Sequence, residues 1–190
     1  MTYEQLNKLA ERFLAGDMEA ALKLASYAEE HGPVARDVVG VLGRALRFEQ
    51  TRDHAAMGLE AIGPESFPVL HQLIRVLQEV DQDEYCINPF VRAIGGIGPR
   101  AKRASPHLVD ALEHAIENGD SSVLSDLAEA LGKIGAKEAV PLLRRLLDPA
   151  DPDYLDALKS ASEHPVGLRE FHKAWGFIRE TAQEAMAKLT

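Results

Sequence analysis

The chain has 190 residues, a net charge of −9 and an aromatic content of only 6%. Because 30 Asp and Glu outnumber 21 Lys and Arg and no quarter of the chain is basic, the composition argues against a nucleic-acid binder, which gains affinity by neutralising phosphates. Strong helix formers such as Ala and Leu dominate and runs of β-branched residues are nearly absent, which predicts an all-α fold.

The single cysteine, Cys86, cannot form an internal disulfide, which is typical of a reducing compartment. The N-terminal segment predicts an amphipathic helix that is charged throughout, unlike a signal peptide. No apolar run is long enough to cross a membrane. We therefore expect a cytoplasmic protein without membrane association.

The first quarter of the chain predicts irregular helical hairpins. Thr2 can cap a first helix, with Gln5 completing a capping box, and Asp17 can cap a second helix. Gly32-Pro33 then breaks the chain before a third helix. We interpret 1–50 as an N-terminal cap.

The middle of the chain contains a repeated pattern built on an Ile-Gly turn. The three segments that align on it are AMGLEAIGPESFPVLHQLIRVL (56–77), FVRAIGGIGPRAKRASPHLVDAL (90–112) and LAEALGKIGAKEAVPLLRRLL (127–147). The turn glycines, spaced 35 and 37 residues apart, are Gly63, Gly98 and Gly135. A proline follows each turn before an apolar stripe of helical spacing: Pro68, Pro106 and Pro141.

Each unit predicts a helical hairpin. Glycine accepts the left-handed conformation that ends a first helix, and proline begins the second helix, where its missing N–H would have no partner. The middle unit leaves one choice open, because Pro89 either starts its first helix or kinks a longer helix that begins near Asp83. Since one such hairpin cannot bury its apolar face alone, the units must stack.

A helix pair of this length with an Ile-Gly turn and a proline-led second helix resembles the HEAT repeat, and the Ala-rich form here resembles the short bacterial variety also called the phycobilisome-lyase-like repeat. The resemblance implies an all-α solenoid with three HEAT-like repeats in 51–148, at about 52–83, 84–119 and 120–148. The capping regions would be 1–50 and 149–190, with the whole chain forming one continuous domain.

The C-terminal quarter predicts a linker and two helices. The acidic stretch DPADPD (148–153) is rich in helix-start residues and precedes a short helix that ends near Ser162. His164-Pro165 breaks the chain, and a long helix runs from about Gly167 to Lys188.

The sequence predicts no catalytic, cofactor or metal site. The segment 96–101 fits the dinucleotide pattern G-x-G-x-x-G/A, but that pattern needs a strand and a parallel sheet, so we interpret it as a turn. His107, Asp110 and His114 share a helical face without a fourth ligand. The deoxyhypusine hydroxylases, a di-iron family built on such repeats, use His-Glu pairs, and no His-Glu dipeptide occurs here.

The turn of the middle repeat carries a basic triplet that the other two turns lack: Arg100, Lys102 and Arg103. Its side chains are either a solvated loop or a contact for an anion or an acidic partner. Arg92, one turn earlier, either adds to that contact or, as the resemblance to HEAT repeats implies and we favour, makes a buried stacking contact between repeats.

We predict a non-enzymatic protein-interaction module that uses the solvent side of the second helices. The predicted binding ridge consists of His71, Gln72, Arg75, Asp110, Glu113, His114, Glu117 and Arg145. The acidic residues of this ridge are concentrated on the middle repeat, which suits a partner with a basic patch. The module would be a monomeric adaptor, assembly factor or neutralising partner. The alternative, implied only by the resemblance, is a lyase or chaperone-like protein that acts on a pigment-carrying protein.

Three aromatic residues crowd the last predicted helix: Phe171, Trp175 and Phe177. Phe171, Trp175 and Ile178 share one apolar stripe, and Phe177 either widens that stripe or stays exposed. The group either packs the helix onto the end of the stack or forms a hot spot for a partner.

Overall fold

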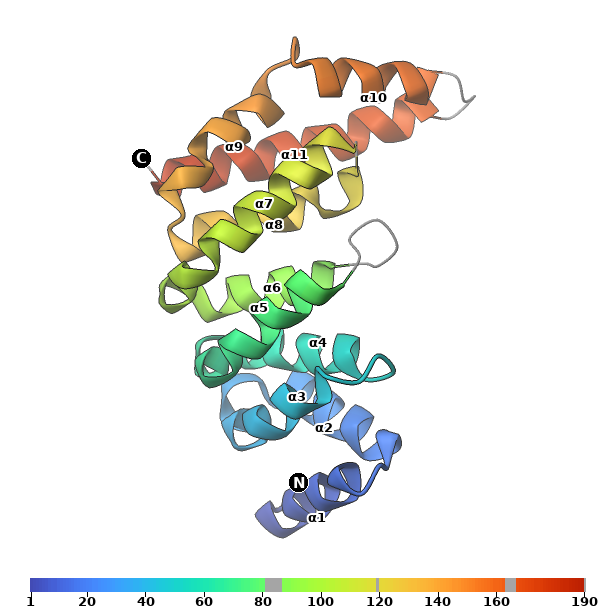
Figure 1. Ribbon diagram of the computed structural model, residues 1–190, viewed down its shortest axis with the longest axis vertical. Coiled ribbons are helices and arrows are strands. Elements are labelled where there is room, and N and C mark those ends of the chain that lie inside the picture. Colours follow the sequence, from blue (N-terminus) through green and yellow to red (C-terminus); the bar gives the residue numbers. More distant parts are fainter. Residues whose placement is uncertain (81–86, 119, 163–166, 190) are drawn as a thin grey trace. The chain divides into compact units, whose positions relative to one another are not determined.

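The structure is a computed structural model that describes residues 1–80, 87–118, 120–162 and 167–189 (Figure 1). These residues form helices and turns and contain no strand. The sequence-based interpretations of Cys86, of a helix start near Asp83 and of His164-Pro165 concern residues outside the described ranges.

The chain divides into two compact units, Met1–Ala104 and Ser105–Thr190, which we call unit 1 and unit 2 and describe separately. The division falls between the turn and the second helix of the middle repeat. The predicted assignment of 1–50, 51–148 and 149–190 to caps and repeats remains a prediction.

Unit 1 contains six α-helices and three 3₁₀ segments among its described residues. The α-helices are α1 (Tyr3–Leu14), α2 (Met18–His31), α3 (Val39–Ala45), α4 (Arg52–Ile62), α5 (Leu70–Glu79) and α6 (Asn88–Ile97). The 3₁₀ segments are η1 (Gly32–Val38), η2 (Gly63–Val69) and η3 (Gly98–Ala104).

The helices of unit 1 begin where the sequence predicts. The Thr2 side chain accepts a hydrogen bond from the Gln5 amide, and the Gln5 side-chain oxygen accepts one from the Thr2 amide, so the predicted capping box is present. Asp17 caps α2 by accepting from the Ala20 amide. Pro89 lies in the first turn of α6, so it starts this helix and does not kink a longer one.

The core of unit 1 lies along a stack of helices in which α4 packs between α2 and α6 (Figure 1). Leu24 of α2, Leu59 of α4 and Phe90 of α6 are each fully buried. A helix with one apolar stripe must bury it against a neighbour. In this stack, each helix covers the apolar stripe of the helix beside it.

A common turn joins the helices of unit 1, and it occurs once more than the sequence pattern indicates. Gly32-Pro33, Gly63-Pro64 and Gly98-Pro99 each open a 3₁₀ segment of 7 residues. The segment that starts at Gly32 joins α2 to α3, so α2–η1–α3 has the same construction as α4–η2–α5. Within 1–50, therefore, one hairpin is a regular unit.

The turn glycines have positive φ, but two of the three predicted ones are not left-handed helical. Gly135 has φ 77° and ψ 37°, as predicted, whereas Gly98 has φ 72° and ψ −150° and Gly63 has φ 69° and ψ −130°. The residue after Gly63 and Gly98 is proline, which excludes helical ψ from the residue before it. Alanine follows Gly135, so that glycine keeps the helical ψ.

Unit 2 contains five α-helices among its described residues: α7 (Ser105–Glu117), α8 (Ser121–Ile134), α9 (Val140–Leu147), α10 (Pro152–Ser162) and α11 (Gly167–Leu189). The 3₁₀ segment η4 (Lys137–Ala139) precedes α9. Pro106 and Pro141 lie in the first turns of α7 and α9, as predicted, whereas Pro68 in unit 1 lies in η2, just before α5.

Helix α11 packs against α8, α9 and α10 (Figure 1). A Cβ on Gly132 of α8 would lie 2.9 Å from the Cα of Ala185, so the two helix backbones meet at a position that only glycine allows. The predicted long C-terminal helix is therefore confirmed, and it supplies much of the core of unit 2.

Replacing Gly98 with alanine isolates the backbone requirement of the turn. A Cβ on Gly98 meets nothing within 4 Å, so the cost comes from a backbone region that is nearly restricted to glycine. We expect Gly98→Ala to lower the free energy of unfolding by about 1–3 kcal/mol, measured by denaturant unfolding.

Gly176→Ala is the matched control. Gly176 lies inside α11 with an equally empty Cβ position, and alanine there should stabilise the helix by about 0.5–1 kcal/mol. Equal effects of the two substitutions would contradict the turn geometry.

Candidate functional site

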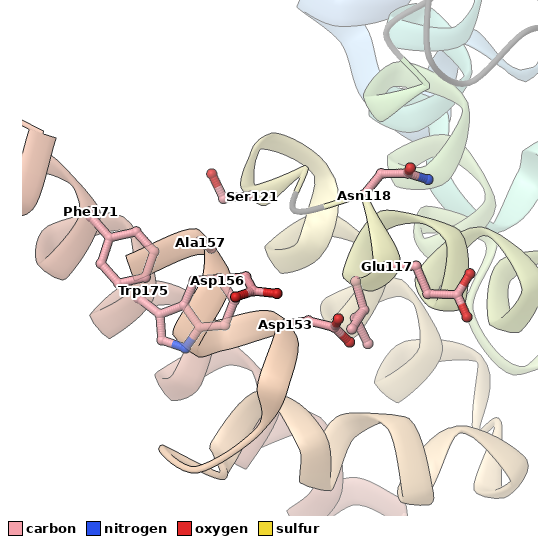
Figure 2. Close-up of a pocket in the computed structure, with 9 residues that line it drawn as sticks. Glu117, Asn118, Ser121, Asp153, Asp156, Ala157, Phe171 and Trp175 are labelled. Carbon is pink, nitrogen blue, oxygen red and sulfur yellow. The ribbon is translucent and has the colours of Figure 1, made fainter. Parts of the chain in front are cut away.

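A cavity of about 350 Å³ opens in unit 2 and brings four helices together (Figure 2). Its lining is Ile116, Glu117, Asn118, Ser121, Asp153, Asp156, Ala157, Phe171 and Trp175. We call this cavity the acidic–aromatic pocket. In Figure 2 the aromatic rings lie on one side, the end of α7 lies on the other, and the aspartates of α10 lie between them.

Local capping residues determine where the helices on each side of the pocket begin and end. Helix α7 ends at Glu117, and Asp120 caps the next helix by accepting a hydrogen bond from the Ser122 amide at 3.0 Å. On the other side, Asp151 caps α10 by accepting from the Asp153 amide at 3.1 Å. The stretch DPADPD therefore works as a capping linker, as predicted.

An ion pair fixes the start of α10 to α9. Arg145 Nε donates to Asp151 Oδ2 at 3.0 Å, and Arg145 also pairs with Asp153. Burial alone would raise the pKa of Asp151, but hydrogen bonds from Arg145 and the Asp153 amide outweigh it and hold this pKa below its usual value. The hydrogen bond to Asp151 also raises the pKa of Arg145.

The aromatic wall is a packed cluster. Phe171 and Trp175 stack with ring centroids 5.4 Å apart, and Tyr154 contacts both rings from α10 at 5.5 and 5.0 Å. Trp175 is only 6% exposed, and its indole nitrogen has no hydrogen-bond partner among the described residues. Packing alone therefore holds the indole ring.

The pocket carries uncompensated negative charge. Its lining contains three carboxylates and no Lys, Arg or His. Asp153 is paired with Arg145, whereas Glu117 and Asp156 form no ion pair within the described part of the chain. The cavity therefore suits a cation with an apolar or planar body.

Three residues of the predicted ridge lie in unit 1, on α5. His71 is exposed and Arg75 is paired with Glu79 at 3.4 Å. Gln72 is half-buried, and its side-chain oxygen is enclosed without a partner in the described structure. Gln72 therefore faces the interior more than predicted.

The other five ridge residues lie in unit 2. Asp110, Glu113 and Glu117 are exposed along α7, and His114 on the same helix is half-buried. Arg145 is committed to Asp151 and Asp153, so its guanidinium stabilises the linker instead of standing free on a ridge. The single ridge remains a prediction, since its members divide between the two units.

The basic triplet lies on η3 in unit 1. The Arg100 guanidinium lies 4.1 Å from the centroid of the Phe67 ring, which connects two neighbouring turns, while Lys102 and Arg103 are exposed. Arg92 contacts Glu60 at 3.1 Å, joining α6 to α4 as the predicted contact between repeats, although both side chains are 38% exposed.

The predicted aromatic group separates into two surfaces. Phe171 and Trp175 line the acidic–aromatic pocket, and Ile178 continues their stripe with an exposure of 1%. Phe177 is 60% exposed and lines a separate hollow with His172 and Lys173. Trp175 and Phe177 are two residues apart on a helix, which turns them to different faces.

Sequence reasoning missed the contribution of α10 to the pocket. Asp153 and Asp156 lie three residues apart in the first turns of that helix, so they share a face. That spacing was visible in the sequence, but the sequence did not show that the end of α7 lies opposite.

A second hollow, in unit 1, has the opposite charge. Phe13, Ala15, Gly16, Met18 and Phe48 form its apolar lining, and Arg44 and Arg47 also line it. A cation would be repelled there, in contrast to the acidic–aromatic pocket.

The described residues contain no group of three or more His, Cys, Asp or Glu side chains placed to hold a metal ion. Among the described helices, none has the length and hydropathy needed to cross a membrane.

Comparison with known proteins bears on the fold. Residues 76–162 match the HEAT_2 model of HEAT repeats. A designed armadillo repeat protein is similar in structure, with a TM-score of 0.59, 17% identity, and coverage of 97% of this chain and 100% of that one. Within residues 76–162 the chain is therefore similar to HEAT repeats.

A second similar structure is an engineered protein solved by the Northeast Structural Genomics Consortium, with a TM-score of 0.58, 21% identity, and coverage of 100% of this chain and 97% of that one. No curated protein matches the chain. The predicted all-α solenoid is confirmed, and the phycobilisome-lyase-like variety of the repeat remains a prediction.

Removing the charge of Asp151 tests the ion pair, because asparagine can still cap α10. We expect Asp151→Asn to lower the free energy of unfolding at pH 7 by about 1.5–3 kcal/mol, the range for hydrogen bonds to charged groups. Since the folded-state pKa of Asp151 is depressed, this difference should persist above pH ~4 and shrink as the pH falls below it.

The control for this measurement is Glu129→Gln, which removes an exposed pair with Lys133 and should change stability by less than about 0.5 kcal/mol. A difference between wild type and Asp151→Asn that does not change with pH would contradict the assignment.

Truncating the two aromatic residues should give opposite results. Because Trp175 is buried, Trp175→Ala should lower the free energy of unfolding by about 3–5 kcal/mol. Phe177→Ala should change it by less than about 0.5 kcal/mol, because that ring is exposed. Thermal and denaturant unfolding measure both, and similar losses for the two variants would show that the placement of the rings is wrong.

Proposed function

We propose that this protein is a non-enzymatic protein-interaction module that binds a partner with a basic patch. The observation that carries the proposal is the row of exposed acidic residues on α7, which ends at the acidic–aromatic pocket. Repeat solenoids present extended surfaces that serve this purpose. The role would be that of an adaptor, an assembly factor or a neutralising partner.

The row consists of Asp110, Glu113 and Glu117, at spacings of three and four residues. All three side chains are exposed, and none forms an ion pair with another described residue. Like charges on one helix face repel each other slightly. A basic partner would relieve that repulsion and associate faster through electrostatic steering.

Charge reversal tests the proposal. The partner is first captured from a lysate of the native host on the immobilised full-length protein, then purified. We expect the triple variant Asp110→Lys, Glu113→Lys and Glu117→Lys to bind that partner about 10- to 100-fold more weakly, with a lower association rate. Titration calorimetry and surface plasmon resonance measure the two quantities.

The matched control reverses three exposed acids of unit 1, Glu11, Glu29 and Glu30, which changes the net charge equally. A partner that binds both triple variants with equal affinity would refute the α7 surface as its site.

A further inference from the structure

We infer that the acidic–aromatic pocket receives the guanidinium group of an arginine side chain that the partner presents. The inference deepens the proposed function and rests on it, but it concerns a single recognition site. It combines three features of the pocket: free carboxylates, an aromatic wall and a helix carboxyl end.

The free carboxylates supply the charge. Glu117 lies at the end of α7, and Asp156 of α10 lies between it and the aromatic rings (Figure 2). Neither is paired within the described residues, and the lining has no cation to neutralise them. A planar guanidinium with five N–H donors can hydrogen-bond to more than one carboxylate at once.

The aromatic wall supplies a surface for a planar cation. The Phe171 and Trp175 rings stack on each other, and Tyr154 of α10 contacts both of them. A cation within about 6 Å of such a ring is attracted by its π face. The same cluster already holds one guanidinium, since Arg179 lies 4.8 Å from the centroid of the Tyr154 ring.

The carboxyl end of α7 adds to the negative electrostatic potential of the pocket. The carbonyl groups in the last turn of a helix carry a partial negative charge, and α7 ends at Glu117, in the pocket lining. Ligands at the carboxyl end of a helix are therefore favoured when they are positive.

Arginine fits these features better than lysine or a metal ion. Guanidinium is weakly hydrated and stacks on aromatic faces, whereas ammonium is a compact and strongly hydrated charge. The described residues hold no cluster of three metal-ligating side chains. A cavity of about 350 Å³ lies at the small end of ligand sites, which suits one side chain.

Trp175 provides a direct readout, because it is the only tryptophan in the chain and it lines the pocket. The test titrates the full-length protein with the blocked peptides acetyl-Gly-Gly-Arg-Gly-Gly-amide, its citrulline counterpart and its lysine counterpart at constant ionic strength. Citrulline keeps the shape and planarity of arginine and lacks its charge.

We expect the arginine peptide to change the tryptophan fluorescence in a saturable way, with a dissociation constant on the order of 1 mM. The citrulline peptide should bind about tenfold more weakly, and the lysine peptide should lie between the two. The double variant Asp156→Asn, Glu117→Gln should also bind the arginine peptide about tenfold more weakly.

The control double variant is Glu180→Gln, Glu184→Gln, which removes two exposed acids of α11 outside the pocket lining. Circular dichroism and melting temperature check that both variants fold. An equal response to arginine and citrulline, or equal binding by both double variants, would overturn the inference.

The peptide titration and the charge-reversal experiment test the two proposals independently, so one proposal can be refuted while the other stands. If the partner binds through α7 but the arginine peptide does not bind, the pocket inference is wrong and the interaction module stands. If the arginine peptide binds but the α7 reversal leaves the affinity for the partner unchanged, the pocket inference stands and the proposed use of α7 is wrong.

Discussion

The structure depends on helices that cannot bury their apolar faces alone. In unit 1 the stripe of α4 is covered on both sides, by α2 and by α6, and in unit 2 the long helix α11 lies against α8 and α9. Burial of apolar surface is the dominant favourable contribution to folding, so each helix is stable only through its neighbours. Turns, caps and ion pairs then fix where each helix begins and ends.

The candidate site follows from the same constraint. Helix α11 buries Trp175 and Ile178 while its other face carries the exposed Phe177. The Arg145–Asp151 pair sets the start of α10, so Asp153 and Asp156 are held beside the aromatic rings and the end of α7. A packing requirement thus places aromatic rings and carboxylates around one cavity, and the proposed recognition of a cation uses what packing has already ordered.

Local features of the fold could be predicted from the sequence because their causes are local. Gly135 ends a helix and Pro89 starts one for reasons contained in a few residues. The exact conformation at Gly98 needed attention to the proline that follows it. The hairpin that turns at Gly32 was predicted as an irregular one because its turn lacks the preceding isoleucine, although Gly32-Pro33 begins the same 3₁₀ segment.

Individual residues of the site could be predicted from the sequence, but their meeting in one cavity could not, because its two sides are far apart in the chain. The sequence singled out Glu117, Phe171 and Trp175 but assigned them to different surfaces, and it placed Arg145 on a ridge although two aspartates of the linker bind it. Such pairings depend on where helices meet in space. Helical periodicity shows which side chains share a face, and it does not show what that face meets.

The most direct test of the account is a crystal structure of the full-length protein with the arginine peptide bound. We expect the guanidinium carbon within about 6 Å of the Phe171 or Trp175 ring, with guanidinium nitrogens about 2.7–2.9 Å from a carboxylate oxygen of Asp156 or Glu117. A guanidinium bound elsewhere on the protein, with the pocket occupied only by water, would contradict it.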